Sequence, residues 1–116
     1  METVQIALHR HDPVSVPARF IGHLAVHREV DPEFLRTGRH GKRAEWTITH
    51  APSGRMVYGF RTRAGAIEAA KAISCLADWS SDAPQETMTF DQREAVRLAI
   101  AAVSIIDCNR VRGNRC

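Results

Sequence analysis

Four of the six histidines are spaced so that they could place two metal ligands side by side. His9 and His11 are two residues apart and share one face of a strand, whereas His23 and His27 are four apart and share one face of a helix. On a strand, His23 and His27 are about 13 Å apart, which is too far to share one ion. No Cys-x-x-Cys pair is present and no acidic residue is placed to complete a set, so we expect no metal and no cofactor. A metal-dependent or other enzyme that uses these histidines is the last of three alternatives.

Other catalytic patterns are missing from the sequence. Cys75 lies in an alanine-rich stretch, where we expect a buried and unreactive thiol. No Gly-x-Ser-x-Gly elbow is present, and Ser53-Gly54-Arg55 lacks the spacing and the lysine of a phosphate-binding loop. The acidic residues between positions 78 and 86 lie in a polar segment that is typical of a solvated linker. We therefore predict that the protein is not an enzyme.

A cluster of basic residues is the strongest functional signal in the chain. Residues 36–63 contain seven arginines and lysines and a single acid, Glu45. Guanidinium groups can hold phosphates or carboxylates through two parallel hydrogen bonds. Base stacking requires exposed aromatic rings, and we expect Trp46, Tyr58 and Phe60 to lie in the core, so contact with a backbone is favoured over base recognition. The predicted partner-binding site consists of Arg36, Arg39, His40, Lys42, Arg43, Arg55, Arg61 and Arg63.

The charge of the chain is divided between two regions of opposite sign. Residues 78–94 contain five acids and one base, Arg93, whereas residues 36–63 and the last residues of the chain are basic. The formal net charge is only +3, so the distribution is more informative than the total. Such polarity favours an anionic partner on the basic side, although a solvated surface without a partner is an equally good interpretation.

The length and composition indicate one globular domain. The chain has 116 residues, of which 44% are hydrophobic and 25% charged, and these fractions exclude wholesale disorder. We assign residues 1–108 to a single domain and residues 109–116 to a basic C-terminal tail. No apolar run reaches the roughly 18 residues that a membrane span needs, and the first residues lack the layout of a signal peptide. We therefore expect a cytoplasmic protein that does not contact membranes.

The first 44 residues contain short strand signals and many turn residues. Val4, Ile6 and Leu8 alternate with other residues and predict a strand, and the prolines that follow predict a connection over residues 10–18. Residues 20–30 fit both a period of two and a period of 3.6, and we favour a strand because Gly22 weakens a helix. Residues 31–44 contain one proline and two glycines and predict a long loop.

The rest of the chain predicts a β-hairpin followed by two helices. Residues 45–50 and 55–60 alternate, with Trp46, Ile48, His50, Met56, Tyr58 and Phe60 expected to face the helices. The opposite face, with Thr47 and Thr49, is small and uncharged, so it could lie close against another element. Thr62 is a good N-cap for a helix over residues 63–76, and Thr89 to Gln92 fits the capping box of a helix that runs to about Asp107.

Strands followed by helices predict an α+β fold. We expect an antiparallel sheet of three to four strands with two C-terminal helices packed on one face. The second helix has little polar surface, so it is either largely buried or forms an interface, and a homodimer through residues 91–107 is one possibility.

Residues 45–77 resemble part of a known DNA-binding fold. The strand Trp46-Thr-Ile-Thr-His, the strand Gly54-Arg-Met-Val-Tyr-Gly-Phe60 and the Thr62-capped, alanine-rich helix are similar to the second half of AP2-like domains and of the related arm-binding domains of phage integrases. This resemblance implies DNA binding by a sheet that is covered on one side by a helix. The outward positions Thr47, Thr49 and Val57 differ from the arginine- and tryptophan-rich positions of that family.

The overall build resembles small accessory proteins of phages and mobile elements, among which anti-CRISPR inhibitors are the best known. The resemblance implies a non-enzymatic protein that docks on and blocks a host protein or nucleoprotein complex, in some cases as a nucleic-acid mimic. The alternative is a small basic DNA- or RNA-binding protein that uses the same arginines. Direct binding to nucleic acid should weaken steeply as salt rises, whereas protein docking should depend on salt much less.

Overall fold

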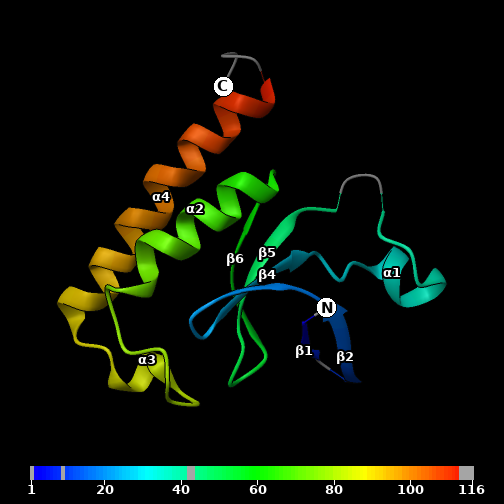
Figure 1. The fold of residues 1–116 in the computed structure, drawn as a ribbon, viewed down its shortest axis with the longest axis horizontal. Helices are drawn as coiled ribbons and strands as arrows, with labels where there is room; N and C mark the ends of the chain where they lie inside the picture. The colour runs from blue at the N-terminus through cyan, green and yellow to red at the C-terminus, as the bar shows by residue number, and fades with distance from the viewer. Residues whose placement is uncertain (1, 9, 42–43, 113–116) are drawn as a thin grey trace.

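The protein has an α+β fold, as the sequence predicts (Figure 1). The computed structural model describes residues 2–8, 10–41 and 44–112. The strands are β1 (Thr3–Leu8), β2 (His11–Pro17), β3 (Arg19–Ile21), β4 (Leu24–Arg28), β5 (Trp46–His50) and β6 (Arg55–Phe60). The helices are α1 (Pro32–Thr37), α2 (Arg63–Ser74), α3 (Pro84–Thr87) and α4 (Phe90–Arg112).

A four-stranded antiparallel sheet in the order β3-β4-β5-β6 forms the centre of the molecule. Helices α2 and α4 pack on one face of this sheet, as expected (Figure 1). The main core lies between these layers and includes Leu24, Val26, Ile48, Phe60, Ala66, Ala69, Ala70, Ile73, Val96, Ile100 and Val103. Ala66, Ala69 and Ala70 of α2 are completely buried, so small side chains on this face allow the helix to approach the sheet closely.

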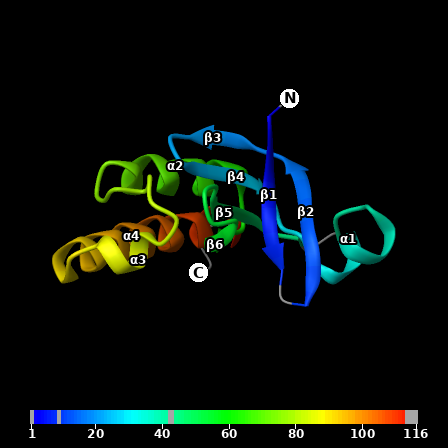
Figure 2. The same cartoon turned by 90° about the horizontal axis from the view of Figure 1, so that it is seen from below.

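The hairpin β1–β2 crosses the other face of the central sheet (Figure 2). A second, smaller core forms there from Val4, Ile6, Val16 and Ala25. Thr47 is 5% exposed and Thr49 is fully buried, so the small outer face of β5 does lie against another element. The covering element is the hairpin, whose second strand the sequence analysis missed.

The prediction of a connection over residues 10–18 is wrong, because residues 11–17 form strand β2. The prolines suggested a break in the strand. Strand β2, however, pairs with β1 along one edge, and a proline at the outer edge of a strand removes no hydrogen bond between strands. The register shifts between Ile6 and Leu8, and Pro13 lies opposite this irregularity. Bulges are among the few places in a sheet where proline is tolerated.

Residues 20–30 are extended, as favoured, but they contain a hairpin and not one strand. Gly22 and His23 form the two-residue turn between β3 and β4, and Gly22 has a φ of +61°. Glycine at the first position of a two-residue turn is typical of tight hairpins. Gly22 therefore ends one strand and begins a turn.

The prediction of a structureless loop over residues 31–44 is also wrong, because it contains α1. The Asp31 carboxylate accepts a hydrogen bond from the Phe34 backbone N–H at 2.9 Å, and Pro32 occupies the first turn. Gly38, with a φ of +76°, ends the helix and donates its N–H to the Phe34 carbonyl at 2.8 Å. These are ordinary start and stop signals for a helix, but the segment has no apolar periodicity to draw attention to them.

The β5–β6 hairpin forms as predicted, but the expected facing of Met56, Val57 and Tyr58 is wrong. A register shift between Ile48 and Thr49 places Met56 opposite Thr49, and the Met56 side chain is 68% exposed. Val57 packs against the main core in its place. Tyr58 is also more exposed than expected, at 43%. An irregularity of one residue moves a side chain to the other face, and the alternation in the sequence does not reveal it.

Helix α2 begins at the predicted cap and is joined there to α4. The Thr62 hydroxyl accepts a hydrogen bond from the Gly65 N–H at 3.0 Å. The buried Asp107 carboxylate accepts bonds from the Arg61 N–H, at 2.7 Å, and from the Thr62 hydroxyl. A side chain on Gly65 would collide with Asp107, so the contact between the two helices requires glycine. Cys75, at the end of α2, is exposed and not buried as predicted.

The segment between α2 and α4 is anchored by Trp79. Its indole Nε1–H donates to the Ile73 carbonyl at 2.9 Å, and its own carbonyl accepts a bond from His50 Nε2 at 2.7 Å. His50 is 2% exposed because this segment covers it.

Helix α4 begins with the predicted capping box and extends beyond its predicted end. The Thr89 hydroxyl accepts from the Gln92 N–H at 3.1 Å, and the Gln92 side chain accepts from the Thr89 N–H at 2.9 Å. The helix continues past Asp107 to Arg112, into the segment assigned to the tail. Within the described residues, no helix is both long enough and apolar enough to cross a membrane.

Candidate anion-binding cleft

An open cleft of about 630 Å³ lies beside Trp46, where the ends of several elements meet. It is bounded by the junction of β2 and β3, the middle and end of β4, the start of β5 and the start of α2. The lining residues are Pro17, Ala18, Arg19, Val26, Arg28, His40, Trp46 and Arg63. We call this surface the Trp46 cleft.

Two arginines pack against the half-buried Trp46 ring. The Arg28 guanidinium carbon lies 5.4 Å from the ring centroid, and that of Arg63 lies 5.9 Å from it. Arg28 is the cross-strand partner of Trp46, so the sheet register brings the two side chains to the same face. Arg63 is the first residue of α2, and the helix start directs it to the same ring. The cation–π contacts reduce the freedom of both guanidinium groups.

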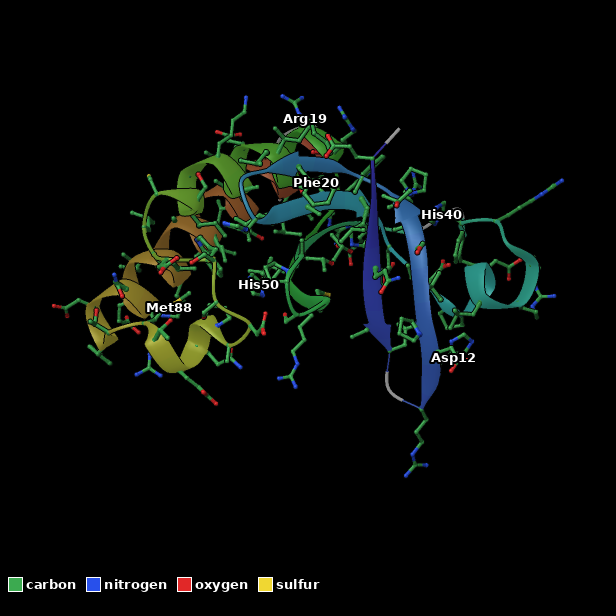
Figure 3. All side chains as sticks on the ribbon, turned by 60° about the horizontal axis from the view of Figure 1, so that its bottom comes forward. Asp12, Arg19, Phe20, His40, His50 and Met88 are labelled. Atoms are coloured by element: carbon green, nitrogen blue, oxygen red, sulfur yellow. The ribbon has the colours of Figure 1, made fainter. Side chains whose placement is uncertain are left out.

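His40 and Arg19 complete the polar lining. The His40 Nδ1–H donates to the Glu29 carbonyl at 2.9 Å, and the imidazole stacks on the Phe34 ring with 4.6 Å between centroids. Helix α1 therefore positions His40 through Phe34, although the sequence predicted a loop there. Arg19 comes from β3, and Figure 3 shows it and His40 on the side of the molecule that carries β2 and β3.

The cleft has an excess of positive charge. Three arginines and a histidine line it, and its lining residues include no acid. The ion pairs of Arg36 with Glu33 and of Arg97 with Glu94 involve none of the lining residues. Among the described residues of the cleft lining, Arg28 has a buried Nε that makes no hydrogen bond. Guanidinium groups arranged in this way suit a phosphate or carboxylate.

The structure brings together only part of the predicted partner-binding site. His40 and Arg63 line the Trp46 cleft, whereas Lys42 and Arg43 lie outside the described residues. Arg36 and Arg39 lie on α1 and directly after it. Arg55 is opposite His50 at the turn end of β6, so most of the strand separates it from Arg61.

Arg61 borders a second cavity of about 450 Å³ whose charge is mixed. Glu29, Glu45 and Asp107 also line it, and among the described residues Arg61 is the only arginine in that lining. An anion in this cavity would face three carboxylates. We therefore place the candidate site at the Trp46 cleft.

Arg19 and Arg28 were not among the predicted site residues. Both lie outside the basic cluster at residues 36–63, since Arg19 begins β3 and Arg28 ends β4. Arg28 lies at the end of an alternating segment, Leu24, Val26, Arg28, whose first two members are in the core. This alternation would have predicted that Arg28 faces the helices. The contact between Arg28 and Trp46, however, depends on the register of β4 and β5.

The candidate metal ligands do not come together in the described ranges. His27 is buried and uses both ring nitrogens, with Nδ1–H donating to the Arg28 carbonyl at 2.7 Å and Nε2 accepting from the Thr49 hydroxyl at 2.6 Å. His11 bonds to the Asp12 carbonyl, and His23 lies in the β3–β4 turn. His9 is outside the described residues. No group of three potential metal ligands is found among the residues that the structure describes.

Comparisons with protein-family models, characterised proteins and solved structures found no match to this chain.

Proposed function

We propose that the protein is a non-enzymatic docking protein of the phage or mobile-element type, which binds an anionic surface of a host protein or nucleoprotein complex and blocks it. The observation that carries the proposal is the set of three arginines and His40 around Trp46, in a cleft whose lining contains no acid. The proposed contact surface is the Trp46 cleft and not the whole of the predicted partner-binding site.

The fixed positions of the arginines support a docking role. Arg28 and Arg63 are held against Trp46, and Arg28 is also part of a β-strand. Groups that are ordered before binding lose less entropy when a partner arrives. The arginines then provide orientation and fast association, while apolar lining residues such as Pro17 and Ala18 contribute contact area.

Direct binding to DNA or RNA is the second candidate, through the same cleft. Trp46 is only half-buried, and an aromatic ring next to arginines can support both base stacking and phosphate contacts. Recognition through the outer sheet face, as in AP2-like domains, is disfavoured because the β1–β2 hairpin covers Thr47 and Thr49.

The test compares Arg28→Gln and Arg63→Gln with the control Arg55→Gln. The control removes one arginine at the start of β6, outside the lining of the Trp46 cleft. Binding of the wild-type protein to labelled single-stranded DNA, duplex DNA and RNA is measured by anisotropy at several salt concentrations. If three phosphates of duplex DNA are contacted, affinity for the duplex should fall about 40-fold between ~50 and ~200 mM salt. Such binding, lost in the cleft variants and kept in the control, supports the nucleic-acid candidate.

Docking on a protein partner predicts a different result from the same variants. Oligonucleotides should bind weakly or not at all at physiological salt. A defined partner captured from host extract and identified by mass spectrometry should bind the purified wild type and Arg55→Gln, and should bind Arg28→Gln and Arg63→Gln at least tenfold more weakly. Equal affinity of all four proteins for the partner would remove the Trp46 cleft from the proposal.

A further inference from the structure

Helix α4 has an apolar stripe on the face opposite the core. Val96, Ile100, Val103 and Asp107 are buried against α2 and the sheet. On the other side, Leu98 is 58% exposed, Ile105 is 65% exposed, and both Ala101 and Ala102 are exposed. Large exposed apolar side chains that line up along one helix face are typical of an interaction surface.

The stripe is symmetric about its own midpoint. One helix face recurs at alternating steps of three and four residues. Leu98 is as far before the point between Ala101 and Ala102 as Ile105 is after it. The described side chains on this face are those at positions 91, 94, 98, 101, 102 and 105.

This symmetry has a direct consequence for pairing with an identical helix. In an antiparallel pair, Leu98 of each copy faces Ile105 of the other, and the alanines meet at the centre, where small side chains allow close approach. The acidic start of the stripe, at Asp91, then lies at the opposite end of the pair from the Asp91 of the other copy. In a parallel pair, each residue faces its own copy, so the two acidic ends would meet and repel each other.

We propose that the protein forms an antiparallel homodimer through this stripe, with the two-fold axis between Ala101 and Ala102. The interface is isologous, because each surface contacts the same surface of its partner. The stripe lies on the side of α4 opposite its buried residues, so pairing needs no rearrangement of the core. The proposal is independent of the function of the Trp46 cleft.

The experiment measures molecular mass by sedimentation over a series of protein concentrations. The wild type should shift from 12.9 kDa towards twice that mass as concentration rises. Leu98→Glu and Ile105→Lys should each weaken dimerisation at least tenfold, since each change places a charge opposite an apolar side chain twice in the dimer. Phe90→Glu is the matched control, because Phe90 is exposed on α4 but lies to the side of the stripe.

The double variant Leu98→Glu with Ile105→Lys decides the orientation. In the antiparallel pair, each new acid faces a new base of the other copy, so the double variant should dimerise more tightly than either single variant. In a parallel pair, like charges would face each other and the double variant would be the weakest. A wild type that stays monomeric, single variants that dimerise normally, or a control as defective as they are would each overturn the proposal. Circular dichroism should give the same helical signal for all variants, since the changed side chains are exposed.

Discussion

His27 is a buried histidine whose environment favours its neutral form. Its side chain lies on the sheet face that the β1–β2 hairpin covers, and it is 2% exposed. The Arg28 carbonyl can only accept a hydrogen bond, so Nδ1 carries the proton and Nε2 accepts from Thr49. Burial lowers the pKa of His27, and the bond to the Arg28 carbonyl opposes this effect in part.

The lowered pKa predicts that stability decreases in mild acid. In the unfolded chain His27 takes up a proton near its ordinary pKa of about 6.5, whereas the folded protein resists protonation until the pH is lower. The free energy of unfolding should therefore be highest above pH ~6.5 and fall below it, by at most about 1.4 kcal/mol per pH unit from this one group. Urea unfolding at a series of pH values measures the slope.

Two variants assign that slope to His27. His27→Gln should be less stable at neutral pH, because it disturbs two buried hydrogen bonds, but its stability should depend less on pH. His11→Gln changes an exposed histidine and should keep the wild-type slope. A wild-type slope in His27→Gln would mean that another group is responsible.

At the scale of the elements, the turn between β5 and β6 joins the two sheets. The Gly54 carbonyl accepts a hydrogen bond from the Ala7 N–H of β1 at 2.8 Å. Gly54 has a φ of +73°, and a Cβ at this position would lie 3.0 Å from the Gln5 carbonyl oxygen and 3.1 Å from the Ala7 nitrogen. Glycine is therefore required both by the turn conformation and by the close approach of β1.

Gly54→Ala and Gly38→Ala separate these two requirements. Both glycines have a positive φ, but a Cβ on Gly38 would meet no atom within 4 Å. Gly38→Ala should cost about 1–2 kcal/mol of unfolding free energy, from the backbone conformation alone. Gly54→Ala should cost clearly more, because β1 must also move away. Equal losses in urea unfolding would show that the contact with β1 contributes little to stability.

At the scale of the whole molecule, the cationic cleft and the acidic segment lie apart. Figure 3 shows Met88, within residues 78–94, on the opposite side of the molecule from His40. Charges separated by more than the Debye length of about 8 Å at physiological salt are largely screened from each other. The acidic segment should therefore have little influence on an anion bound in the Trp46 cleft.

This separation predicts that the acidic side chains do not control anion affinity. The double variant Asp82→Asn with Glu86→Gln should change the affinity for an anionic probe, such as heparin, by less than twofold near ~150 mM salt. Arg28→Gln should lower the same affinity at least tenfold under the same conditions. A large gain in the acidic variant would instead indicate that residues 78–94 compete with the anion for the cleft.

Helix ends and the β5–β6 hairpin could be predicted because their signals are local. Thr62, Thr89 and Gln92 form the expected caps, since each bonds to a backbone group within three residues of itself. The predictions for residues 10–18 and 31–44 failed because a local signal was overridden in the first segment and overlooked in the second. The prolines of β2 are tolerated because that strand pairs along one edge, and Asp31 begins a helix too short to have its own apolar pattern.

The sequence by itself determined the α+β class, the hairpin, the order of the two long helices and the separation of acidic from basic residues. The tertiary structure alone decided which basic residues meet. Arg19, Arg28, His40 and Arg63 come together at Trp46 because strand pairing, α1 and the start of α2 place them there, and these elements are far apart in the chain. Strand register depends on the packing of both sheet faces at once, and no single segment encodes it.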